Sequence, residues 1–314
     1  MRNGNKIAAV FPGQGSQRPG MGKDFYEQMP VCRRVYEEAA DALGWDVAAM
    51  CFGEDEKLNL TEFTQPCIVT TEVCMLRGLA ERYGFEADYF GGHSLGEYTA
   101  LVAAGVLSLS AAVRIVQRRG RLMQEAVPVG VGGMAAVIAE NIEADFLAGV
   151  MEGLDADMAN INSANQIVVS GELAALDEVE ARLKRHFPEG KTFRYIRLNV
   201  SAPFHSRMMK TIESRFAETL EEFGGELVQQ NATVVTSNFT GDFHAADVSG
   251  IKKNLVNQLS HAVKWRQNMQ ALAEKTQEIY EIGPGRPLRD FFRTINVACQ
   301  SVTGLNAAEK VFKA

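Results

Sequence analysis

The sequence is poor in the features that mark secreted, metal-binding or membrane proteins. It has five cysteines in 314 residues, an odd number without any CxxC pair, so neither a disulfide framework nor a zinc motif is expected. No run approaches the roughly 18–20 consecutive apolar residues that a membrane helix needs. The N-terminal residues lack the apolar stretch and cleavage site of a secretory signal. We therefore expect a soluble, cytoplasmic protein with reduced thiols.

The sequence also lacks an excess of basic charge. It contains 32 Lys and Arg residues against 39 Asp and Glu residues, a formal net charge of -7. Neutralising the phosphates of a nucleic acid requires a basic surface, so nucleic-acid binding is not expected. The remaining composition, 46% hydrophobic and 23% charged, is that of an ordinary globular protein. The length suits about two domains, or one large α/β domain with an insertion.

Short apolar runs that end in glycine-rich turns alternate with helical patterns, which is typical of α/β proteins. Three of these runs, over residues 7–11, 88–90 and 278–282, are predicted strands. Each is followed by a tight turn that contains glycine. Active sites in parallel sheets gather where strands end in such turns, so we expect the three turns to meet at one crevice.

The middle of the chain has a different pattern. Three apolar runs read as strands and two segments between them read as helices: strands over 134–138, 167–171 and 193–198, helices over about 142–153 and 172–186. A unit of this size and order is similar to a small ferredoxin-like subdomain. We therefore predict a large catalytic domain made of residues 1–128 and 200–314, with residues 129–199 inserted as the small subdomain.

Gly92-His93-Ser94-Leu95-Gly96 matches the G-x-S-x-G pattern of a nucleophile elbow. A short strand is predicted before it and a helix after it, which is the context that the motif requires. The sharp turn would expose the Ser94 hydroxyl, and the Leu95 backbone N–H is placed to donate to an oxyanion. A serine that merely caps an ordinary helix is the alternative interpretation.

A serine nucleophile needs a base, and the chain has only five histidines. His93 lies inside the elbow and is interpreted as structural, His186 lies on a charged helix end, and His244 follows a predicted turn. His205 lies where the chain returns from the insertion to the large domain, which makes it the best candidate. No acid between Ser94 and His205 lies at the end of a strand of the main sheet, so a Ser–His dyad is favoured over a triad.

Arg119 stands out on a predicted helix over residues 112–125. At about 100° per residue, Ala112, Ile115, Val116, Leu122 and Met123 form one apolar stripe. Arg119 falls in the middle of that stripe. A guanidinium directed inward is costly unless it meets a carboxylate or another bidentate partner. The spacing alone leaves open whether that partner is a structural salt bridge or a ligand.

Two motifs together, residues 11–17 (FPGQGSQ) and 92–97 (GHSLGE), resemble the malonyl-CoA:acyl-carrier-protein transacylases and the acyltransferase domains of fatty-acid and polyketide synthases. The first motif lacks the Gly-Lys-Ser/Thr of a phosphate loop, so nucleotide hydrolysis is not expected. The resemblance continues in order along essentially the whole chain, through Thr64–Pro66, Arg119–Pro128, Asn162–Ser163, Pro203–Ser206, Gln258–Leu259, Val263–Trp265 and Glu281–Gly285.

The resemblance implies a hydrolase-like α/β domain with a ferredoxin-like subdomain. It also implies a ping-pong reaction that moves malonyl from malonyl-CoA to the phosphopantetheine thiol of an acyl carrier protein, without a metal or another cofactor. Ser94 would carry the acyl group and His205 would be the base, oriented by the backbone carbonyl of Gln258.

By the same resemblance, the backbone N–H groups of Gln14 and Leu95 would form the oxyanion hole, and Arg119 would bind the free malonyl carboxylate. Phe204 is similar to the residue that in related domains crowds the acyl α-carbon and favours malonyl over methylmalonyl. Many bacterial stand-alone transacylases have serine there, so Phe204 moves the interpretation toward the polyketide-type members.

Three alternatives remain open at this stage: a stand-alone acyltransferase that serves a polyketide synthase, a proofreading acyl hydrolase with the same elbow, and a non-catalytic scaffold for an acyl carrier protein. Arg119 favours a dicarboxylic acyl group over a plain acyl chain. Intact Ser94, His205 and Arg119 speak against a scaffold.

An acyl carrier protein is typically acidic, so an acidic enzyme needs a local basic patch to dock it. Residues 181–200 contain six basic residues and one acidic residue. Docking is therefore predicted there, through Arg182, Lys184, Arg185, Lys191 and Arg194. An ordinary solvated helix face is the alternative, and Arg118 with Arg121 is the next patch to consider.

Overall fold

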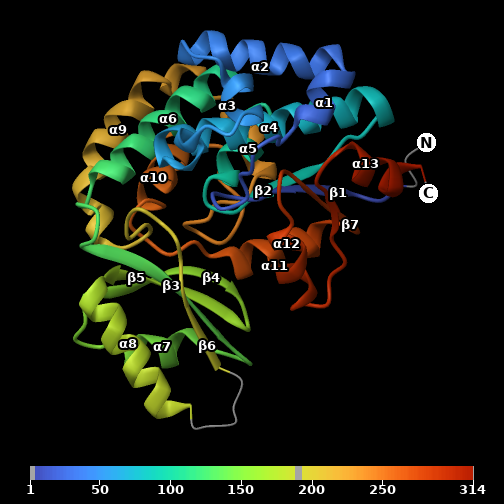
Figure 1. Cartoon of the computed structure of the whole chain (residues 1–314). Coiled ribbons are helices and arrows are strands. Elements are labelled where there is room, and N and C mark those ends of the chain that lie inside the picture. The colour runs from blue at the N-terminus through green and yellow to red at the C-terminus, as the bar shows by residue number, and fades with distance from the viewer. Residues whose placement is uncertain (1–3, 188–192, 314) are drawn as a thin grey trace.

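Two sheets organise the fold (Figure 1). The computed structural model describes residues 4–187 and 193–313. It contains a parallel four-stranded sheet in the order β2-β1-β7-β8 and an antiparallel four-stranded sheet in the order β4-β5-β3-β6. The predicted α/β class and the parallel sheet are confirmed.

The parallel sheet consists of β1 (Ile7–Phe11), β2 (Tyr89–Gly92), β7 (Glu278–Ile282) and β8 (Gln300–Val302). Phe11 pairs with Gly92, and Val10 pairs with Glu281, so the carboxyl ends of β1, β2 and β7 lie at the same edge. The glycine turns that follow these three strands meet there. A Cβ atom on Gly13 would lie 2.5 Å from the His93 carbonyl, and one on Gly283 would lie 2.6 Å from Pro12.

Helices cover both faces of the parallel sheet, as a buried parallel sheet requires. Ala9 and Phe11 of β1 join the core formed with the first six helices, whereas Ala8 and Val10 pack against α11 and α12 on the other face. The helices of this domain are α1 (Lys23–Gln28), α2 (Pro30–Leu43), α3 (Val47–Phe52), α4 (Thr61–Tyr83), α5 (Gly96–Ala103), α6 (Leu109–Glu125), α9 (Glu213–Glu222), α10 (Val248–Asn257), α11 (Trp265–Lys275), α12 (Pro287–Arg293) and α13 (Leu305–Phe312), with short 3-10 turns over Glu56–Asn59, Arg207–Ile212, Gly224–Glu226 and Gln229–Val234. No helix in the described part of the chain is both long enough and apolar enough to cross a bilayer.

Helix α6 carries Arg119 on its buried side, as its periodicity predicts. The helix begins at Leu109, where the Ser108 side chain accepts from the N–H of Ala111 and caps it. Gly120 lets α6 approach α4 closely, because a Cβ atom there would lie 2.5 Å from the Thr61 carbonyl oxygen. This close approach brings Arg119 toward the end of the parallel sheet where the glycine turns meet.

The antiparallel sheet consists of β3 (Gly132–Ala139), β4 (Ala156–Ser163), β5 (Gln166–Glu172) and β6 (Phe193–Arg197), with helices α7 (Ala144–Val150) and α8 (Leu173–His186). The predicted strands and helices of this region are all present within a few residues of their expected bounds. Strand β4 was not predicted, because Asp157, Asn160 and Asn162 hide its apolar pattern.

The antiparallel sheet packs on both of its faces. One face, with Val137 and Val169, forms a core with α7 and α8, whereas Ala136 and Val168 belong to the core of the large domain. The backbone of β4 also bonds directly to the large domain, since the N–H of Val263 donates to the Ala159 carbonyl at 2.9 Å. The antiparallel sheet is therefore joined to the large domain by packing and by backbone hydrogen bonds.

Candidate active site

Ser94 lies in the turn between β2 and α5, with a positive φ of 51°. A non-glycine residue in this left-handed region is uncommon and marks a strained turn. The glycines on either side allow the turn to close. A Cβ atom on Gly92 would lie 2.0 Å from the Gly96 carbonyl carbon, and one on Gly96 would lie 2.1 Å from the Phe11 carbonyl oxygen. The pattern G-x-S-x-G is thus explained by the lack of room beside the strand ends.

His205 lies against Ser94, although 111 residues separate them in the sequence. Its Nε2 atom is 2.7 Å from Ser94 Oγ, and its Nδ1 atom is 2.7 Å from the backbone carbonyl of Gln258. A carbonyl oxygen only accepts, so Nδ1 carries the proton and Nε2 of the neutral ring accepts from the serine hydroxyl. The partner of Nδ1 is a carbonyl rather than a carboxylate, which agrees with the predicted dyad.

Burial is the main cause that lowers the pKa of His205, to about 3, and the positive charge of Arg119 lowers it further. The hydrogen bond to Gln258 acts in the opposite direction. The imidazole is therefore neutral at physiological pH and has a free lone pair for the Ser94 proton. The His205 backbone, like that of Ser94, has a positive φ, here 57°.

Arg119 is 1% exposed and reaches the same point from α6. It donates from Nη1 to Gln65 Oε1 and from Nη2 to Gln258 Oε1, each at 2.9 Å, and from Nη2 to Ser94 Oγ at 3.3 Å. These three acceptors are neutral, and within the described part of the chain Arg119 Nε has no acceptor. Burial lowers the pKa of Arg119. A buried guanidinium with neutral partners remains able to bind a carboxylate.

The turn after β1 supplies the other predicted site residue. Gln14 lies in this turn, and its side chain donates to Thr61 Oγ1 at 3.2 Å, which holds the turn against α4. Among the described residues, neither the backbone N–H of Gln14 nor that of Leu95 makes a hydrogen bond. Free N–H groups in the turns around a serine are what an oxyanion hole requires.

Asn238, which the sequence does not single out, bonds to the backbone of the elbow on both sides of His93. Asn238 Oδ1 accepts from the Ser94 N–H at 2.6 Å, and Asn238 Nδ2 donates to the Gly92 carbonyl at 2.7 Å. Asn238 is 144 residues from Ser94, in a loop whose composition carries no signal for this role. Gln65 was noted only as part of a motif, and its contact with Arg119 could not be read from its position in the sequence.

The other histidines lie outside the Ser94–His205 pair. His93 Nε2 bonds Asn162 Oδ1 at 2.7 Å and its ring packs edge-on against Trp265, in agreement with a structural role. His186 packs against Phe146. His244, expected only to follow a turn, is buried, and its Nε2 lies 2.9 Å from Glu97 Oε1.

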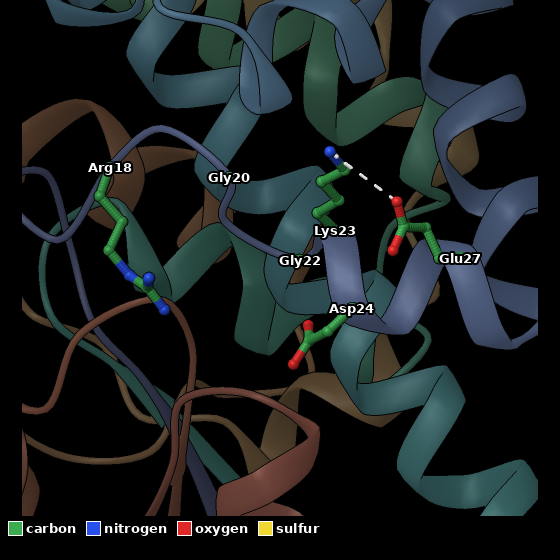
Figure 2. Close-up of a pocket in the computed structure, with 6 residues that line it drawn as sticks. All are labelled: Arg18, Gly20, Gly22, Lys23, Asp24 and Glu27. Atoms are coloured by element: carbon green, nitrogen blue, oxygen red, sulfur yellow. Dashed lines mark ion pairs between the residues drawn. The ribbon is translucent and has the colours of Figure 1, made fainter.

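Phe204, which precedes His205, is 6% exposed and belongs to the core of the large domain. The described part of the chain contains no group of three or more His, Cys, Asp or Glu side chains that could hold a metal ion. A separate hollow of about 420 Å³ is lined by Arg18, Gly20, Gly22, Lys23, Asp24 and Glu27 (Figure 2). Its Lys23–Glu27 ion pair lies on the exposed start of α1, and none of its lining residues belongs to the serine site.

The basic residues of the predicted docking patch have acidic neighbours that their own segment does not reveal. Arg182 and Arg185 both pair with Glu178, and Lys184 pairs with Glu180. Arg194 is exposed on β6, and Lys191 lies outside the described residues. The patch therefore carries less free positive charge than the composition of residues 181–200 suggests.

Comparison with known proteins gives consistent results. Residues 9–284 match the family described as the acyl transferase domain. The malonyl CoA-acyl carrier protein transacylase of Bacillus subtilis is 39% identical over 299 residues, which cover 93% of this chain and 91% of that protein. The crystal structure of the malonyl CoA-acyl carrier protein transacylase of Clostridium perfringens superposes with a TM-score of 0.88 at 33% identity, covering 98% of this chain and 96% of that one. A malonyl-transacylase in complex with a type II polyketide synthase acyl carrier protein superposes with a TM-score of 0.86 at 33% identity, covering 98% and 99% of the two chains.

Proposed function

The chain belongs to the family of malonyl-CoA:acyl-carrier-protein transacylases, and from this premise we propose that it transfers malonyl by a ping-pong mechanism through an acyl-enzyme on Ser94. The family membership confirms the resemblance found in the sequence, and the protein is an acyltransferase. The observation that carries the mechanism is the 2.7 Å contact between Ser94 Oγ and His205 Nε2 at a strained elbow.

In the first half-reaction, Ser94 Oγ bonds to the thioester carbonyl carbon of malonyl-CoA while its proton passes to His205 Nε2. The oxyanion accepts hydrogen bonds from the backbone N–H groups of Gln14 and Leu95. When the intermediate collapses, the carbon–sulfur bond breaks and the imidazolium returns the proton to the sulfur of CoA. Gln258 holds the ring throughout, since its carbonyl accepts from Nδ1 at 2.7 Å.

In the second half-reaction, the phosphopantetheine thiol of an acyl carrier protein takes the place of CoA. It gives its proton to His205 and attacks the ester on Ser94, and the serine oxygen leaves with that proton. Every step uses groups of this chain and its two substrates, so the proposal includes no metal or redox cofactor.

Selectivity for malonyl is assigned to Arg119. A guanidinium that is buried among neutral acceptors gains a charge-assisted partner when a malonyl carboxylate enters, whereas an acetyl group offers none. This argues against a hydrolase of plain acyl chains, for which an apolar residue would serve better. Phe204, which is buried and precedes the base in the sequence, is proposed to crowd a substituent on the acyl α-carbon. A phenylalanine at this position also favours the polyketide-type members of the family.

An acyl carrier protein is proposed as the acyl acceptor, in line with the names of the relatives. Docking through Arg182, Lys184, Arg185 and Arg194 remains part of the proposal, because exposed ion pairs are weak and can be exchanged for acids of a partner. The second candidate is the pair Arg118 and Arg121. These two arginines line a pocket of about 350 Å³ with Leu122, Arg215, Glu218 and Thr219.

We also propose the finer description of the architecture. The small subdomain has the order strand–helix–strand–strand–helix–strand, which supports a ferredoxin-like unit. Its helices and one sheet face form a separate buried cluster drawn from residues 135–183, which supports an inserted unit over 129–199 within a hydrolase-like domain of 1–128 and 200–314.

The test of the mechanism is the intact mass of the protein after mixing with malonyl-CoA in the absence of a carrier protein. We expect one malonyl adduct per chain in the wild type, none in Ser94→Ala, and formation slowed by several orders of magnitude in His205→Ala. Ser170→Ala is the matched control, since Ser170 is a fully buried serine of β5 whose hydroxyl has no hydrogen-bond partner in the described structure. A wild-type burst of CoA release from Ser94→Ala would refute the assignment.

A further inference from the structure

We propose that Glu97 is a positioning residue for malonyl selectivity, and that the buried His244 holds Glu97 in place. Glu97 fixes the side-chain amide of Gln258 in the orientation that presents its oxygen to Arg119. The inference rests on the proposed function, because it concerns how the site is arranged for the malonyl carboxylate.

Glu97 lies in the first turn of α5, three residues after Ser94, and is 0% exposed. Its Oε2 atom accepts from Gln258 Nε2 at 2.6 Å and from the N–H of Asn238 at 3.0 Å. Its Oε1 atom lies 2.9 Å from His244 Nε2. A buried carboxylate is costly unless such partners satisfy it. All three partners of the carboxylate come from the segment 238–258.

The chemistry of its neighbours leaves Gln258 a single amide orientation. A carboxylate only accepts hydrogen bonds and a guanidinium only donates them. Gln258 therefore turns its NH2 group to Glu97 and to the Ser94 carbonyl, at 3.1 Å, and its oxygen to Arg119 Nη2, at 2.9 Å. Without a carboxylate at position 97, the Ser94 carbonyl would be the one acceptor left for this NH2 group among the described residues, so the amide would be held less firmly toward Arg119.

Glu97 also supplies a negative charge that Arg119 does not contact directly. Burial lowers the pKa of Arg119, and the negative charge of Glu97 is one of the causes that act in the opposite direction. A direct carboxylate partner would pair with the charge of the guanidinium, whereas the neutral amide of Gln258 accepts one N–H of Nη2 and leaves that charge unpaired for a malonyl carboxylate. The arrangement thus leaves the guanidinium without a direct carboxylate partner and open to the substrate.

His244 completes the arrangement. Both side chains of the Glu97–His244 pair are 0% exposed, and the His244 backbone N–H donates to the Val235 carbonyl at 2.9 Å. The histidine occupies the carboxylate oxygen that Gln258 does not use, so the carboxylate cannot rotate away from Gln258. The same loop carries Asn238, which holds the Ser94 N–H.

The experiment compares Glu97→Gln with Glu72→Gln by the single burst of CoA release from malonyl-CoA and from acetyl-CoA without a carrier protein. The second-order rate constant of that burst gives kcat/KM of the first half-reaction. Glu72 is an equally buried glutamate on α4 that accepts from Thr99 Oγ1 at 2.5 Å and has no bond to Gln258. In Glu97→Gln we expect the ratio of malonyl to acetyl kcat/KM to fall about tenfold or more, as for a lost hydrogen bond to a charged group. In Glu72→Gln the ratio should remain that of the wild type.

A ratio that is unchanged in Glu97→Gln, with both rates lowered equally, would overturn the proposal, since a purely structural role lowers the two rates together. The effect should also vanish in an Arg119→Ala background, where Glu97→Gln has no guanidinium to act through. A full further loss of preference in that background would equally contradict it.

The His244 variants keep the test decisive if Glu97→Gln fails to fold. His244→Gln retains a donor for Glu97 Oε1 and should keep the wild-type ratio, whereas His244→Leu removes the donor and should lower the ratio. Equal ratios in both variants would refute the role of His244. Absence of any malonyl adduct on wild-type Ser94 would instead refute the proposed function, so the two failures are distinguishable.

Discussion

Replacing Arg119 by alanine tests the proposed origin of selectivity for malonyl. The guanidinium is 1% exposed, and its partners among protein side chains are neutral amide and hydroxyl oxygens. A malonyl carboxylate would add charge-assisted hydrogen bonds, each worth about 1.5–3 kcal/mol. One such bond corresponds to about 10- to 150-fold in kcat/KM, and a bidentate pair to about 10²- to 10⁴-fold. Acetyl-CoA lacks the carboxylate and should lose none of this.

The assay is the burst of CoA release in a stopped-flow instrument, with malonyl-CoA and acetyl-CoA measured separately and no carrier protein present; its second-order rate constant gives kcat/KM of the first half-reaction. Malonyl kcat/KM should fall by at least about tenfold, while acetyl kcat/KM holds or rises. Arg114→Ala is the control, because Arg114 is on the exposed face of the same helix, over the ring of Phe223. Equal losses for both substrates in Arg119→Ala would show that the arginine supports the fold or the base rather than the malonyl group.

Three further predictions concern the base, the acyl pocket and the partner. Because burial depresses the pKa of His205 to about 3, below the unfolded value near 6.5, its contribution to stability is present above pH 6.5 and is lost as the pH falls toward 3. Denaturant unfolding between pH 6.5 and pH 3 should therefore show the wild type losing stability relative to His205→Asn, by up to about 1.4 kcal/mol per pH unit. Parallel stability curves for the two proteins would contradict burial as the cause of the lowered pKa. Phe204→Ser should raise the methylmalonyl-to-malonyl ratio of adducts in intact mass spectra, and an unchanged ratio would remove the steric role. Reversing Lys184 and Arg185 to Glu should raise the KM for the carrier protein and weaken its salt dependence without changing the malonyl-CoA half-reaction; wild-type constants at low salt would direct attention to the Arg118 patch.

Features that depend on near neighbours in the sequence were predicted correctly. The elbow follows from Gly92 and Gly96, because the room beside a strand end is a local property of the turn. Arg119 could be placed on a buried helix face, because the helical period by itself sorts apolar from polar positions. The sequence also favours a histidine without a carboxylate partner, since no acid between Ser94 and His205 lies at the end of a strand of the main sheet. The partner of His205 Nδ1 is indeed a backbone carbonyl.

The surroundings of these residues were decided only by the tertiary structure. Asn238 and Glu97 lie 141 residues apart, and a single asparagine or glutamate in a sequence does not state which distant N–H group it meets. His244 lies in a loop, as predicted, but its burial could not be predicted because it comes from the packing of that loop against α5. Strand β4 was not predicted because it carries polar side chains that bond to the large domain, as Asn162 does to His93.

The charge of the predicted docking patch shows the same division. The sequence by itself determines that residues 181–200 are basic, and it also contains the acids just before them. Glu178 and Glu180 pair with Arg182 and Lys184 four residues further on, which the predicted helix over 172–186 already implies. Only the tertiary structure decides that Arg197 of β6 pairs with Asp177 of α8. Composition counts charges along the chain, whereas binding depends on the charges that the fold leaves unpaired at the surface.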